Sequence, residues 1–575
     1  MIRLKPQREF KKLLYSIDGH GYKAYKRLAG EVYDFEKYTV SVDRVQGDPF
    51  ATPSIVRIAV KNWLSKEVLQ SRARRIGIED LIARKAWQAC QKASRKRGTG
   101  KSGAIYFPKP GQEILERTCV RITENRIELR VFLGLPAHGR RIDASQAWAM
   151  FSSSLEEIVM KSLLPAAHTH EAIFSRLKLM DDKERMREQL SERGLVAFVP
   201  DGAILPRRSG VDSRPMSAER AVRFRSPESL RVELTLSDGS KISGMGIRRG
   251  VTLITGGGYH GKTTLLEAIM SGIYDHVEGD GREYVVTEKS AFNIRAEDGR
   301  RVERVDISSF ISHLPTGGNV REFCTEDASG STSMAANLVE AMEAGSTLFL
   351  IDEDTSATNF MIRDARMQAL IPRSSEPIVP LIDRIREMTE NLGISFIVVV
   401  GGAGDYLDVA DTVIAMDSFL PHDVTIKARE IVSLYPSQRI EDVPEPVRVP
   451  SPRIPSPKSF NPSKGKKREY TKSVGTDYLA LGYEKIELGE VETIVSESQV
   501  RGIGHAILYA LRSDIIDGKK SMKVIAQEIE RQIWGSSLDI LFESVVSPDV
   551  EEFRPQDLVA AINRLRTLQV IRKRN

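Results

Sequence analysis

A glycine-rich loop between an apolar strand and a helix is the strongest constraint on the fold of this chain. Val251–Thr255 has the composition of a buried strand, and a helix is expected to follow the loop. The loop itself is Gly256-Gly257-Gly258-Tyr259-His260-Gly261. Glycines let backbone N–H groups close around phosphate oxygens, and the next helix points its positive end at the same anion. The sequence therefore predicts a P-loop, with Lys262 on the β and γ phosphates of ATP and the Thr263 hydroxyl on Mg²⁺.

An acidic pair follows a second apolar strand. Leu348–Ile351 runs directly into Asp352-Glu353. At the end of a strand, Asp352 can hold the Mg²⁺ shell through water, and Glu353 can accept a proton from the attacking water. These acids could also simply end a strand. Because the P-loop is present, we predict that Glu353, Asp352 and Lys262 form the catalytic set.

A short serine-glycine segment lies one helix ahead of that strand. Ser329 and Gly330 lead into the helical run Ser333–Gly345, and Asp352 follows Thr332 by twenty positions. A hydroxyl and an unobstructed backbone at a helix start can approach a γ phosphate closely. Alone, these small residues could merely cap the helix. The spacing to Asp352 favours the phosphate-binding interpretation.

Composition excludes several classes of protein. The chain has 575 residues, enough for roughly three or four domains. No apolar run approaches the roughly 18 to 20 residues that cross a bilayer, and the N-terminal residues lack the apolar core of a signal peptide. We therefore expect a cytoplasmic protein without a membrane domain. The three cysteines are isolated, so neither a zinc site nor a disulfide framework is indicated.

Four regions are expected along the chain. The fold class is α/β, with a P-loop core of mixed or parallel sheet over residues 166–440. An α+β basic domain precedes it over residues 1–165, as a candidate for RNA binding. A proline-rich basic linker is expected over 441–475, extended and semi-rigid, followed by a small, mainly helical domain over 476–575.

Positive charge is concentrated in one stretch. Between Ser71 and Lys101 there are ten Lys or Arg and two acids, a net +8 over 31 residues. Such a run can neutralise nucleic-acid phosphates, although it is more often a solvated helix face. The candidate contacts are Arg72, Arg74, Arg75, Arg95, Lys96, Arg97 and Lys101. A second basic cluster closes the proline-rich stretch: Lys464, Lys466, Lys467, Arg468 and Lys472.

Two other features of the N-terminal region can each be interpreted in more than one way. Aromatic residues among basic ones could stack on single-stranded bases or form core: Tyr15, Tyr22, Tyr25, Tyr33, Phe35 and Tyr38. Residues 98–103 contain Gly-Lys-Ser, but Arg95 takes the place of the first glycine of a P-loop and no apolar strand precedes it. We expect a basic, flexible loop there.

Seven segments in order carry a resemblance to a known family. They are Val45–Ala51, Gly134–Ala137, Asp201–Arg207, Gly256–Lys262, Ala328–Ser333, Asp352–Asn359 and Val400–Tyr406. On these the chain resembles the ABC superfamily, and more narrowly the soluble ABC-class ATPases that include the ATPase of the trypanosome mitochondrial RNA-binding complex. The narrower resemblance covers most of the chain.

The resemblance implies how the sites are assembled. ATP would be hydrolysed at two composite sites of a head-to-tail homodimer, with Ser329 and Gly330 of one subunit facing Lys262 of the other. Ser356–Asn359 matches the D-loop that links the sites, and the flanking domains would face RNA. The expected nucleotide-binding residues are Gly256, Gly257, Gly258, Tyr259, His260, Gly261, Lys262, Thr263, Thr264, Ser329, Gly330, Ser331, Asn359, Gly401, Gly402 and Asp405.

Departures from the ABC pattern predict slow hydrolysis. Asp354 replaces the usual proline, and no glutamine lies between Thr263 and Ile351, so Ser308 or Ser309 is the candidate substitute at the metal. The switch histidine position falls on Gly401, whose side chain cannot bond a phosphate. Backbone N–H groups of Gly401–Gly404, or Asp405, would then take over part of that role.

Three functional classes remain open. The first is an ATPase coupled to RNA or another single-stranded nucleic acid. The second is a nucleotide-gated dimeric clamp or scaffold for protein partners, which the sequence does not separate from the first. The third, the ATPase subunit of a transporter, is disfavoured by the missing glutamine and histidine and by the large extra domains.

Overall fold

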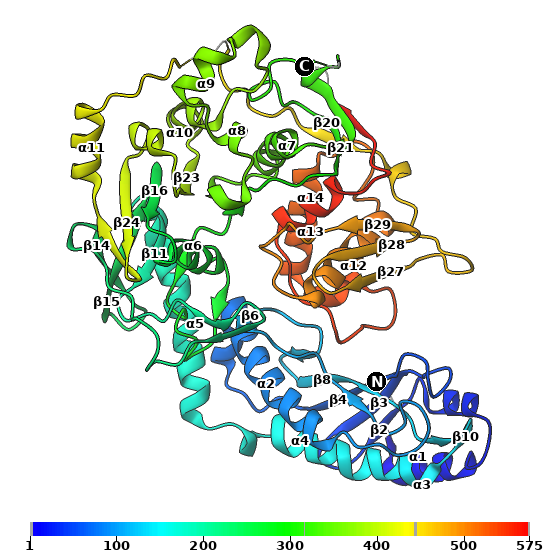
Figure 1. The fold of residues 1–575 in the computed structure, drawn as a ribbon. Helices are drawn as coiled ribbons and strands as arrows, with labels where there is room; N and C mark the ends of the chain where they lie inside the picture. The colour runs from blue at the N-terminus through cyan, green and yellow to red at the C-terminus, as the bar shows by residue number, and fades with distance from the viewer. Residues whose placement is uncertain (1–3, 316, 442–444, 573–575) are drawn as a thin grey trace. The chain divides into compact units, whose positions relative to one another are not determined.

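The computed structural model describes residues 4–315, 317–441 and 445–572, and its contacts divide the chain into two compact units. Unit 1 contains the residues up to Asp181 together with Ile533–Glu552. Unit 2 contains Asp182–Gln532 and the residues from Phe553 onward. Figure 1 shows the elements of both units in chain order. The four-domain division remains a prediction.

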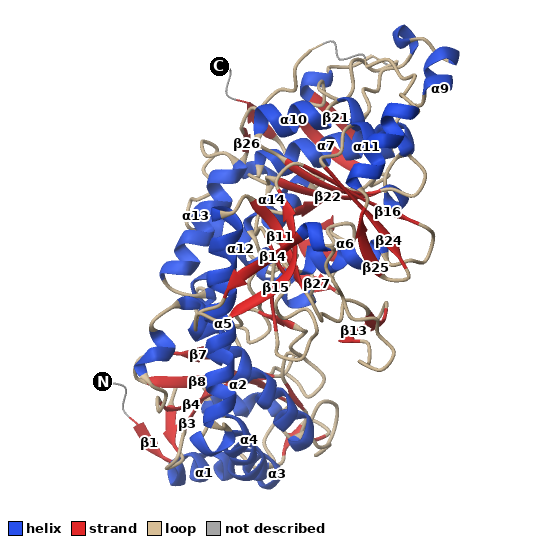
Figure 2. Ribbon diagram, turned by 90° about the vertical axis from the view of Figure 1, so that its left-hand side faces the viewer, coloured by secondary structure: helices blue, strands red, loops and turns tan. Residues whose placement is uncertain are grey.

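Unit 1 is a sheet covered by helices. Its strands lie in the order β1-β2-β3-β4-β8-β5, with β7 also paired to β8. Helices α1, α2, α3 and α4 gather on one face of this sheet (Figure 2). The strands are β1 (Leu4–Pro6), β2 (Val32–Asp34), β3 (Thr39–Arg44), β4 (Ser54–Lys61), β5 (Ile105–Tyr106), β7 (Val120–Ile122) and β8 (Arg126–Leu133), and the helices are α1 (Gln7–Ser16), α2 (Arg72–Ala93), α3 (Ala144–Ala149) and α4 (Leu155–Ser162).

The aromatic residues of unit 1 belong mainly to its core. Five of the six that could stack on bases are buried: Tyr22, Tyr25, Tyr33, Phe35 and Tyr38. The hydroxyl groups of Tyr22, Tyr25 and Tyr38 donate inside the unit; that of Tyr25, for example, donates to the carbonyl of Pro136 at 2.7 Å. The base-stacking hypothesis is therefore wrong for these five. Tyr15 is exposed.

The Gly-Lys-Ser loop at residues 98–103 is fixed by its neighbours. Backbone N–H groups of Thr99, Lys101 and Gly103 donate to carbonyls of two of the segments that carry the family resemblance, Val45–Ala51 and Gly134–Ala137, at 2.7–2.8 Å. A Cβ on Gly100 would lie 2.6 Å from the Pro49 carbonyl oxygen. The expectation of a flexible loop is therefore wrong, although the segment is indeed no P-loop.

The segment 533–552 completes unit 1. Arg117, near the centre of the unit, donates to Glu551 at 2.6 Å, and Arg130 on β8 donates to Asp539 at 2.7 Å. Both arginine side chains are almost fully buried. Residues expected in one C-terminal domain thus lie in two different units.

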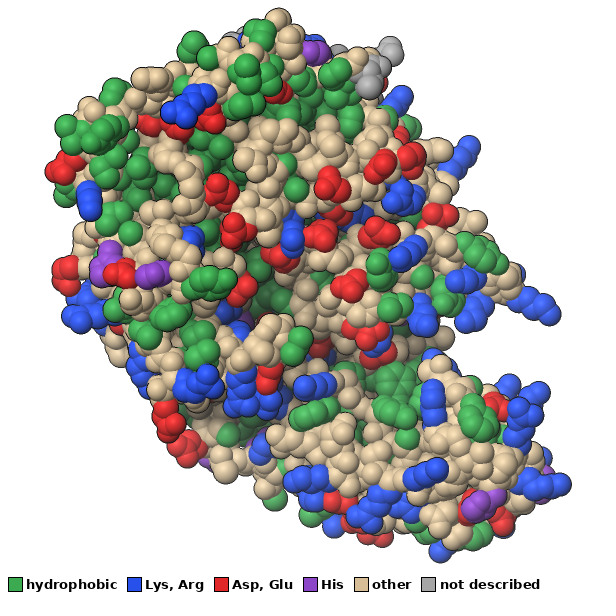
Figure 3. All heavy atoms as spheres, in the orientation of Figure 1, with side chains coloured by type: hydrophobic (Ala, Val, Ile, Leu, Met, Phe, Trp, Pro, Cys, Tyr) green, Lys and Arg blue, Asp and Glu red, His purple; other side chains and the backbone are tan. Residues whose placement is uncertain are grey.

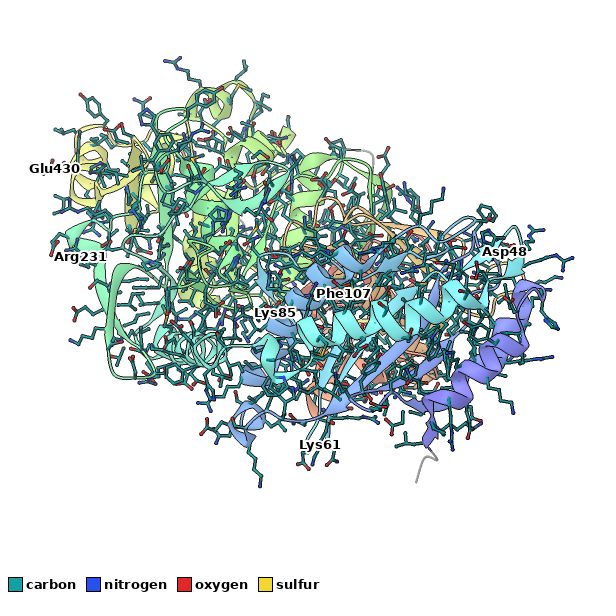
Figure 4. The ribbon with its side chains drawn as sticks, turned by 90° about the horizontal axis from the view of Figure 1, so that it is seen from below. Asp48, Lys61, Lys85, Phe107, Arg231 and Glu430 are labelled. Carbon is teal, nitrogen blue, oxygen red and sulfur yellow. The ribbon has the colours of Figure 1, made fainter. Side chains whose placement is uncertain are left out.

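Strand β4 lies between β3 and β8, and only its last residue is exposed. Lys61 ends β4 and is exposed. Its side chain projects away from the ribbon in Figure 4.

Unit 2 is built on a six-stranded sheet with the order β19-β22-β23-β16-β24-β25. All neighbours are parallel except β24 and β25, which form an antiparallel hairpin. The central strands are almost wholly buried and apolar, as parallel strands covered on both faces must be. The elements are β16 (Val251–Gly256), β19 (Phe292–Asn293), β22 (Leu348–Asp352), β23 (Ser395–Val399), β24 (Thr412–Asp417), β25 (Leu420–Asp423), α6 (Lys262–Ser271), α7 (Gly330–Glu343) and α10 (Ile385–Leu392). The predicted α/β core is confirmed.

A second, antiparallel sheet of unit 2 has the order β14-β15-β11-β18. Phe198 and Leu234 from its strands pack with Met186 and Leu190 in a small apolar core. This region therefore contains both parallel and antiparallel strands, as expected for a mixed sheet. The strands are β11 (Leu195–Pro200), β14 (Arg231–Thr235), β15 (Lys241–Arg248) and β18 (Val286–Thr287).

The C-terminal part of unit 2 contains a small sheet as well as helices. Strands β27 (Thr471–Val474), β28 (Tyr478–Leu481) and β29 (Glu484–Glu487) form an antiparallel meander, beside which α12 (Glu497–Arg512) packs. Helices α13 (Met522–Gly535) and α14 (Pro555–Asn563) follow. Within the described ranges, no helix combines the length and the apolar character needed to cross a membrane.

Part of the expected linker is folded into unit 2. β26 (Arg453–Pro455) pairs with β30 (Val570–Arg572). Arg453 is buried and donates to Glu343 at 2.8 Å and to Asn563 at 2.8 Å. An extended tether is therefore wrong from Arg453 onward, because a buried arginine needs fixed partners. Residues 442–444 of the expected linker lie outside the described residues.

Candidate nucleotide-binding site

The P-loop joins β16 to α6 and depends on two glycines with left-handed backbone. Gly256 has φ 129° and Gly261 has φ 92°. A Cβ on Gly256 would lie 2.3 Å from the carbonyl oxygen of Met416 on the neighbouring strand β24. The loop can therefore run this close to the sheet only without side chains at these positions.

Lys262, the first residue of α6, lies over its own loop. Its ammonium group donates to the carbonyls of Gly256 at 2.8 Å and Gly257 at 2.9 Å. Both partners are backbone acceptors of the loop that would surround a phosphate. The ammonium therefore lies over the loop in which the phosphates are expected.

The next residue meets the acidic strand end. The Thr263 hydroxyl donates to Asp352 Oδ2 at 3.0 Å, and the other carboxylate oxygen accepts from the backbone N–H of Asp354 at 3.1 Å. A hydroxyl and a carboxylate side by side are the oxygen ligands that Mg²⁺ prefers. These residues fit the metal: Thr263 and Asp352 would hold Mg²⁺, which would neutralise charge on the β and γ phosphates.

Glu353 is held by the residues at the switch position. Its Oε2 accepts from the backbone N–H groups of Gly401 at 2.6 Å and Gly402 at 3.2 Å. We expected these N–H groups to face a phosphate; in this structure they bind the carboxylate. Asp405, the other candidate, accepts from the Ser437 hydroxyl at 2.6 Å.

The serine-glycine segment begins α7, as its spacing predicted. The Ser331 hydroxyl donates to Asn359 Oδ1 at 2.7 Å, which joins the segment to the predicted D-loop. Ser329 is exposed and its hydroxyl bonds with that of Thr332 at 3.1 Å. The described contacts of Ser329 and Gly330 do not include the P-loop of the same chain.

Ser308 and Ser309 find their partners elsewhere. The Ser308 hydroxyl donates to Asp306, and the Ser309 hydroxyl accepts from the backbone N–H of Arg448 at 3.1 Å. Their described hydrogen bonds do not reach Thr263 or Asp352. Their proposed role at the metal thus gains no support.

A carboxylate that the sequence did not indicate lies near the metal-binding residues. Edge strand β19 pairs with β22, and Asn293 on β19 and Arg295 after it both donate to Glu492. Burial raises the pKa of Glu492; Arg295 opposes this shift, and the negative charges of Glu267 and Asp352 add to it. Glu492 follows Asp352 by 140 positions (492 − 352). No local pattern could have paired them.

Two further P-loop residues have distinct positions. Tyr259 has φ 63° and is fully exposed. The Nδ1 atom of His260 accepts from the backbone N–H of Ser418 at 2.8 Å, so the loop is bonded to the turn between β24 and β25. Thr264 follows on the first turn of α6.

The predicted nucleic-acid contacts of unit 1 divide into two groups. Those at the start of α2 are already paired: Arg72 with Glu116 at 2.7 Å, Arg74 with Asp181 at 2.7 Å, and Arg75 with Glu79 at 3.0 Å. Arg97 donates to Gln146 and Ser154, and Lys101 is half-buried. Arg95 and Lys96 are exposed. The structure does not bring all seven together on one free surface.

The second basic cluster lies beside two tyrosines, the half-buried Tyr470 and the exposed Tyr483. The ammonium of Lys464 is 4.5 Å from the ring centroid of Tyr470 and 5.5 Å from that of Tyr483, and Lys467 is 4.9 Å from Tyr470. Tyr483 is 70% exposed. We call these four residues the Lys–Tyr surface. Lysine and arginine side chains gather at this projecting end of the β27–β29 sheet (Figure 3).

The fold and the site together define a P-loop ATPase of the ABC type. Three family models match in chain order: "ATPase of the ABC class N-terminal" over residues 7–166, the P-loop domain of ABC ATPases over 169–451, and "MRB1590 C-terminal domain" over 470–571. The chain belongs to the ATPases of the ABC class.

One curated relative and two solved structures are similar to parts of the chain. "Uncharacterized protein MJ1628" of Methanocaldococcus jannaschii is 33% identical over 246 residues, which cover 41% of this chain and 53% of the relative. The chain thus spans about half the length of that relative.

The solved structures are cbiO1 of Clostridium perfringens, part of the ABC transporter complex cbiONQ, and a putative metal-chelate type ABC transporter in an inward-facing conformation. The first is 15% identical, with a TM-score of 0.24, and covers 36% of this chain and 93% of that chain. The second is 11% identical, with a TM-score of 0.26, and covers 41% of this chain and 85% of that chain. Scores this low carry nothing about function.

Proposed function

We propose that this chain hydrolyses ATP at two composite sites of a head-to-tail homodimer, and that the ATP cycle is coupled to binding of single-stranded RNA. One observation carries the ATPase proposal. The P-loop lysine, the Thr263–Asp352 pair and Glu353 lie at the same end of one parallel sheet, where the strands β16 and β22 finish. This is the edge at which open α/β sheets bind their ligands.

The arrangement divides the chemistry among the residues. Lys262 binds and orients the terminal phosphates, and Thr263 and Asp352 hold the metal. Glu353 accepts a proton from the attacking water. The N–H groups of Gly401 and Gly402 compete with that water for the same carboxylate oxygen. This competition supports a slow ATPase.

The state of the Ser329 segment supports a site shared between two copies. Ser329 is exposed at the start of a fourteen-residue helix, and Gly330 beside it carries no side chain. A helix of this length directs a partial positive charge outward at this end. A γ phosphate held by the P-loop of a second copy would bind to the N-terminal end of this helix.

The RNA part of the proposal is best supported by the Lys–Tyr surface. The exposed ring of Tyr483 next to the ammonium groups provides a stacking face and phosphate contacts together, as single-stranded nucleic acids require. Arg95 and Lys96 add a second exposed basic site in unit 1. The arginines at the start of α2 are already neutralised and add little.

Single-turnover hydrolysis tests the ATPase proposal. The Glu353→Gln variant should lower the rate roughly 10²- to 10⁴-fold, the usual contribution of a general base, while ATP still binds. Hydrolysis at the wild-type rate would remove Glu353 from this role. The molar mass with ATP in this variant, measured by light scattering, should be that of a dimer.

Labelled single-stranded RNA, titrated with and without ATP across a salt series, tests the coupling. Affinity should fall with salt, and Lys464→Glu with Lys467→Glu should reduce the log–log salt slope by about 1 for each residue. Lys427→Glu, an exposed lysine on α11 (Thr425–Leu434), is the matched control. Binding that does not change with salt, or with ATP, would contradict the proposal.

A further inference from the structure

A cavity of about 290 Å³ lies next to the P-loop in unit 2. One side is formed by Gly261, Thr264 and Leu265, from the end of the loop and the first turn of α6. The remaining lining residues are mainly apolar and come from two other segments: Leu205, Pro206, Met216, Arg220, Ala221, Val222, Phe224, Met416 and Phe419. Its volume is near the roughly 300 Å³ lower end of small-molecule sites.

The turn between β24 and β25 places Phe419 at this cavity in an unusual conformation. Asp417 pairs with Leu420, so the turn has two residues, Ser418 with φ 49° and Phe419 with φ 68°. Such turns favour Asn-Gly, because the left-handed backbone is strained for side chains with a Cβ. Backbone strain of this kind persists where the surrounding structure fixes the conformation, and strained residues are frequent at ligand-binding sites.

This turn is fixed to the P-loop at two points. The backbone N–H of Ser418 donates to His260 at 2.8 Å. The Phe419 ring lies so close to Gly261 that a Cβ on this glycine would be 3.1 Å from it. Phe419 nevertheless remains 54% exposed. A large aromatic side chain is thus held against the phosphate-binding loop with much of its surface uncovered.

Another part of the cavity wall comes from Asp201–Arg207. This segment is one of the seven that resemble the family, and no function has been assigned to it so far. Asp201–Arg207 is tied down at both ends. Arg207 pairs with Asp280 at 2.8 Å, and the backbone N–H of Phe224 donates to the Ala203 carbonyl at 2.9 Å. Leu205 and Pro206 of this segment thereby face the cavity as a fixed apolar wall.

We propose that this cavity binds the purine base of the nucleotide, with the base stacked on Phe419 and packed against Leu205 and Pro206. This inference rests on the proposed ATPase function. The cavity begins at Thr264, directly after the residues assigned to the phosphates and the metal, so a nucleoside joined to those phosphates reaches it. Arg220 is the one charged side chain in the lining, so stacking and apolar contact dominate recognition.

Two variants of Phe419 test the stacking. Phe419→Ala should weaken ATP binding by roughly 5- to 100-fold, the range found when an aromatic under a base is removed. Phe419→Gly should weaken ATP equally while relieving the backbone strain, so reduced affinity cannot be ascribed to misfolding. Phe419→Trp should retain the affinity. Calorimetry of the full-length protein gives these values.

Inorganic tripolyphosphate separates the base site from the phosphate site. It has no base, so its affinity should be the same in wild type and in all three Phe419 variants. If ATP binds wild type no more tightly than tripolyphosphate, or if Phe419→Ala leaves ATP affinity unchanged, the base site is wrong and the phosphate site stands. If wild type binds neither compound, both this inference and the proposed function fail.

A charge placed at another lining residue, Val222, gives an independent test. Val222 lines the cavity and is 42% exposed, so Val222→Asp should fold and should weaken ATP but not tripolyphosphate. Val211→Asp is the matched control, because Val211 lies in the same chain segment, is 99% exposed and does not line the cavity. Equal ATP affinity in the two variants would contradict the proposed wall.

Discussion

The P-loop of unit 2 and the start of α2 in unit 1 both carry basic side chains, but these side chains bind different kinds of partner. Lys262 bonds only to two carbonyls of its own loop, which a ligand can replace. Arg72 and Arg75 already bond to carboxylates in the interior of unit 1. The first cation is available for binding, and the other two stabilise a fold. A run of basic residues in a sequence does not distinguish these cases.

The largest effect is expected where a cation is structural. Arg75→Ala should destabilise the protein by about 3–5 kcal/mol, because it leaves the carboxylates of Glu79 and Glu116 buried without this partner. Chemical unfolding measures the loss. Arg95→Ala, an exposed arginine just beyond the same helix, should change stability by under about 0.5 kcal/mol. If both substitutions changed stability equally, Arg75 would not be a structural cation in contrast to Arg95.

A slightly smaller effect, on activity alone, is expected for the binding cation. Lys262→Ala should lower the rate of ATP hydrolysis roughly 10²- to 10³-fold, the usual result of deleting one preorganised donor to a charged transition state. Steady-state phosphate release measures it. The unfolding midpoint should stay close to that of wild type, because no buried carboxylate loses a partner. A large loss of stability would place Lys262 with the structural cations.

Lys183 is a third kind of cation, fully buried and only loosely paired with a carboxylate. Burial lowers the pKa of Lys183 to about 7, and Arg187 lowers it further, while Asp275, 3.9 Å away, opposes the shift. The unfolded chain therefore binds more protons than the folded one above pH 7, and stability rises with pH. Between pH 7 and 8.5 the gain from this group should be about 1–2 kcal/mol.

The Lys183→Met variant isolates that contribution. Its unfolding free energy, measured by urea titration at several pH values, should rise less over this interval than that of wild type. The Val285 carbonyl loses a donor at 2.6 Å, which lowers stability at every pH and does not alter the slope. An unchanged slope would show that Lys183 remains charged.

The smallest effect is expected at the switch position. Gly401 binds Glu353 through its backbone, and a Cβ added there would lie 3.8 Å from the carboxylate oxygen, an ordinary contact. Gly401→Ala should therefore change the rate of hydrolysis by less than about twofold. Single-turnover assays beside Lys262→Ala make the comparison. A drop of the size expected for Lys262→Ala would show that the rate depends on the absence of a side chain at position 401, and not only on its backbone N–H.

Local patterns predicted where the glycine-rich loop and the acidic strand end lie in the fold, while phosphate binding there stays a prediction. Strand–loop–helix order and the interval between Thr332 and Asp352 are short-range features, and the structure places the loop after β16 and Asp352 at the end of β22 in the same sheet. Glu492 and Phe419 could not be found in this way. Glu492 is bound by Asn293 and Arg295, far from it in sequence, and Phe419 lies in the turn of the β24–β25 hairpin.

Composition misled where burial decides. The proline-rich stretch predicted a solvated linker, yet Arg453 within it is enclosed by Glu343 and Asn563. Likewise, tyrosines interleaved with lysines resembled a stacking surface and proved to be core. In both cases the partners are distant in sequence, and only the folded chain shows which side chains they cover.

The return of residues 533–552 to unit 1 has a consequence for synthesis. The arginine side chains of Arg117 and Arg130 lack Glu551 and Asp539 until the ribosome has passed the long stretch between Asp181 and Ile533. N-terminal domains usually fold first as they emerge, at about 5–20 residues per second. Here the segment 533–552 is made 352 positions after Asp181 (533 − 181), so unit 1 gains its last contacts roughly 20–70 seconds after its first part is made.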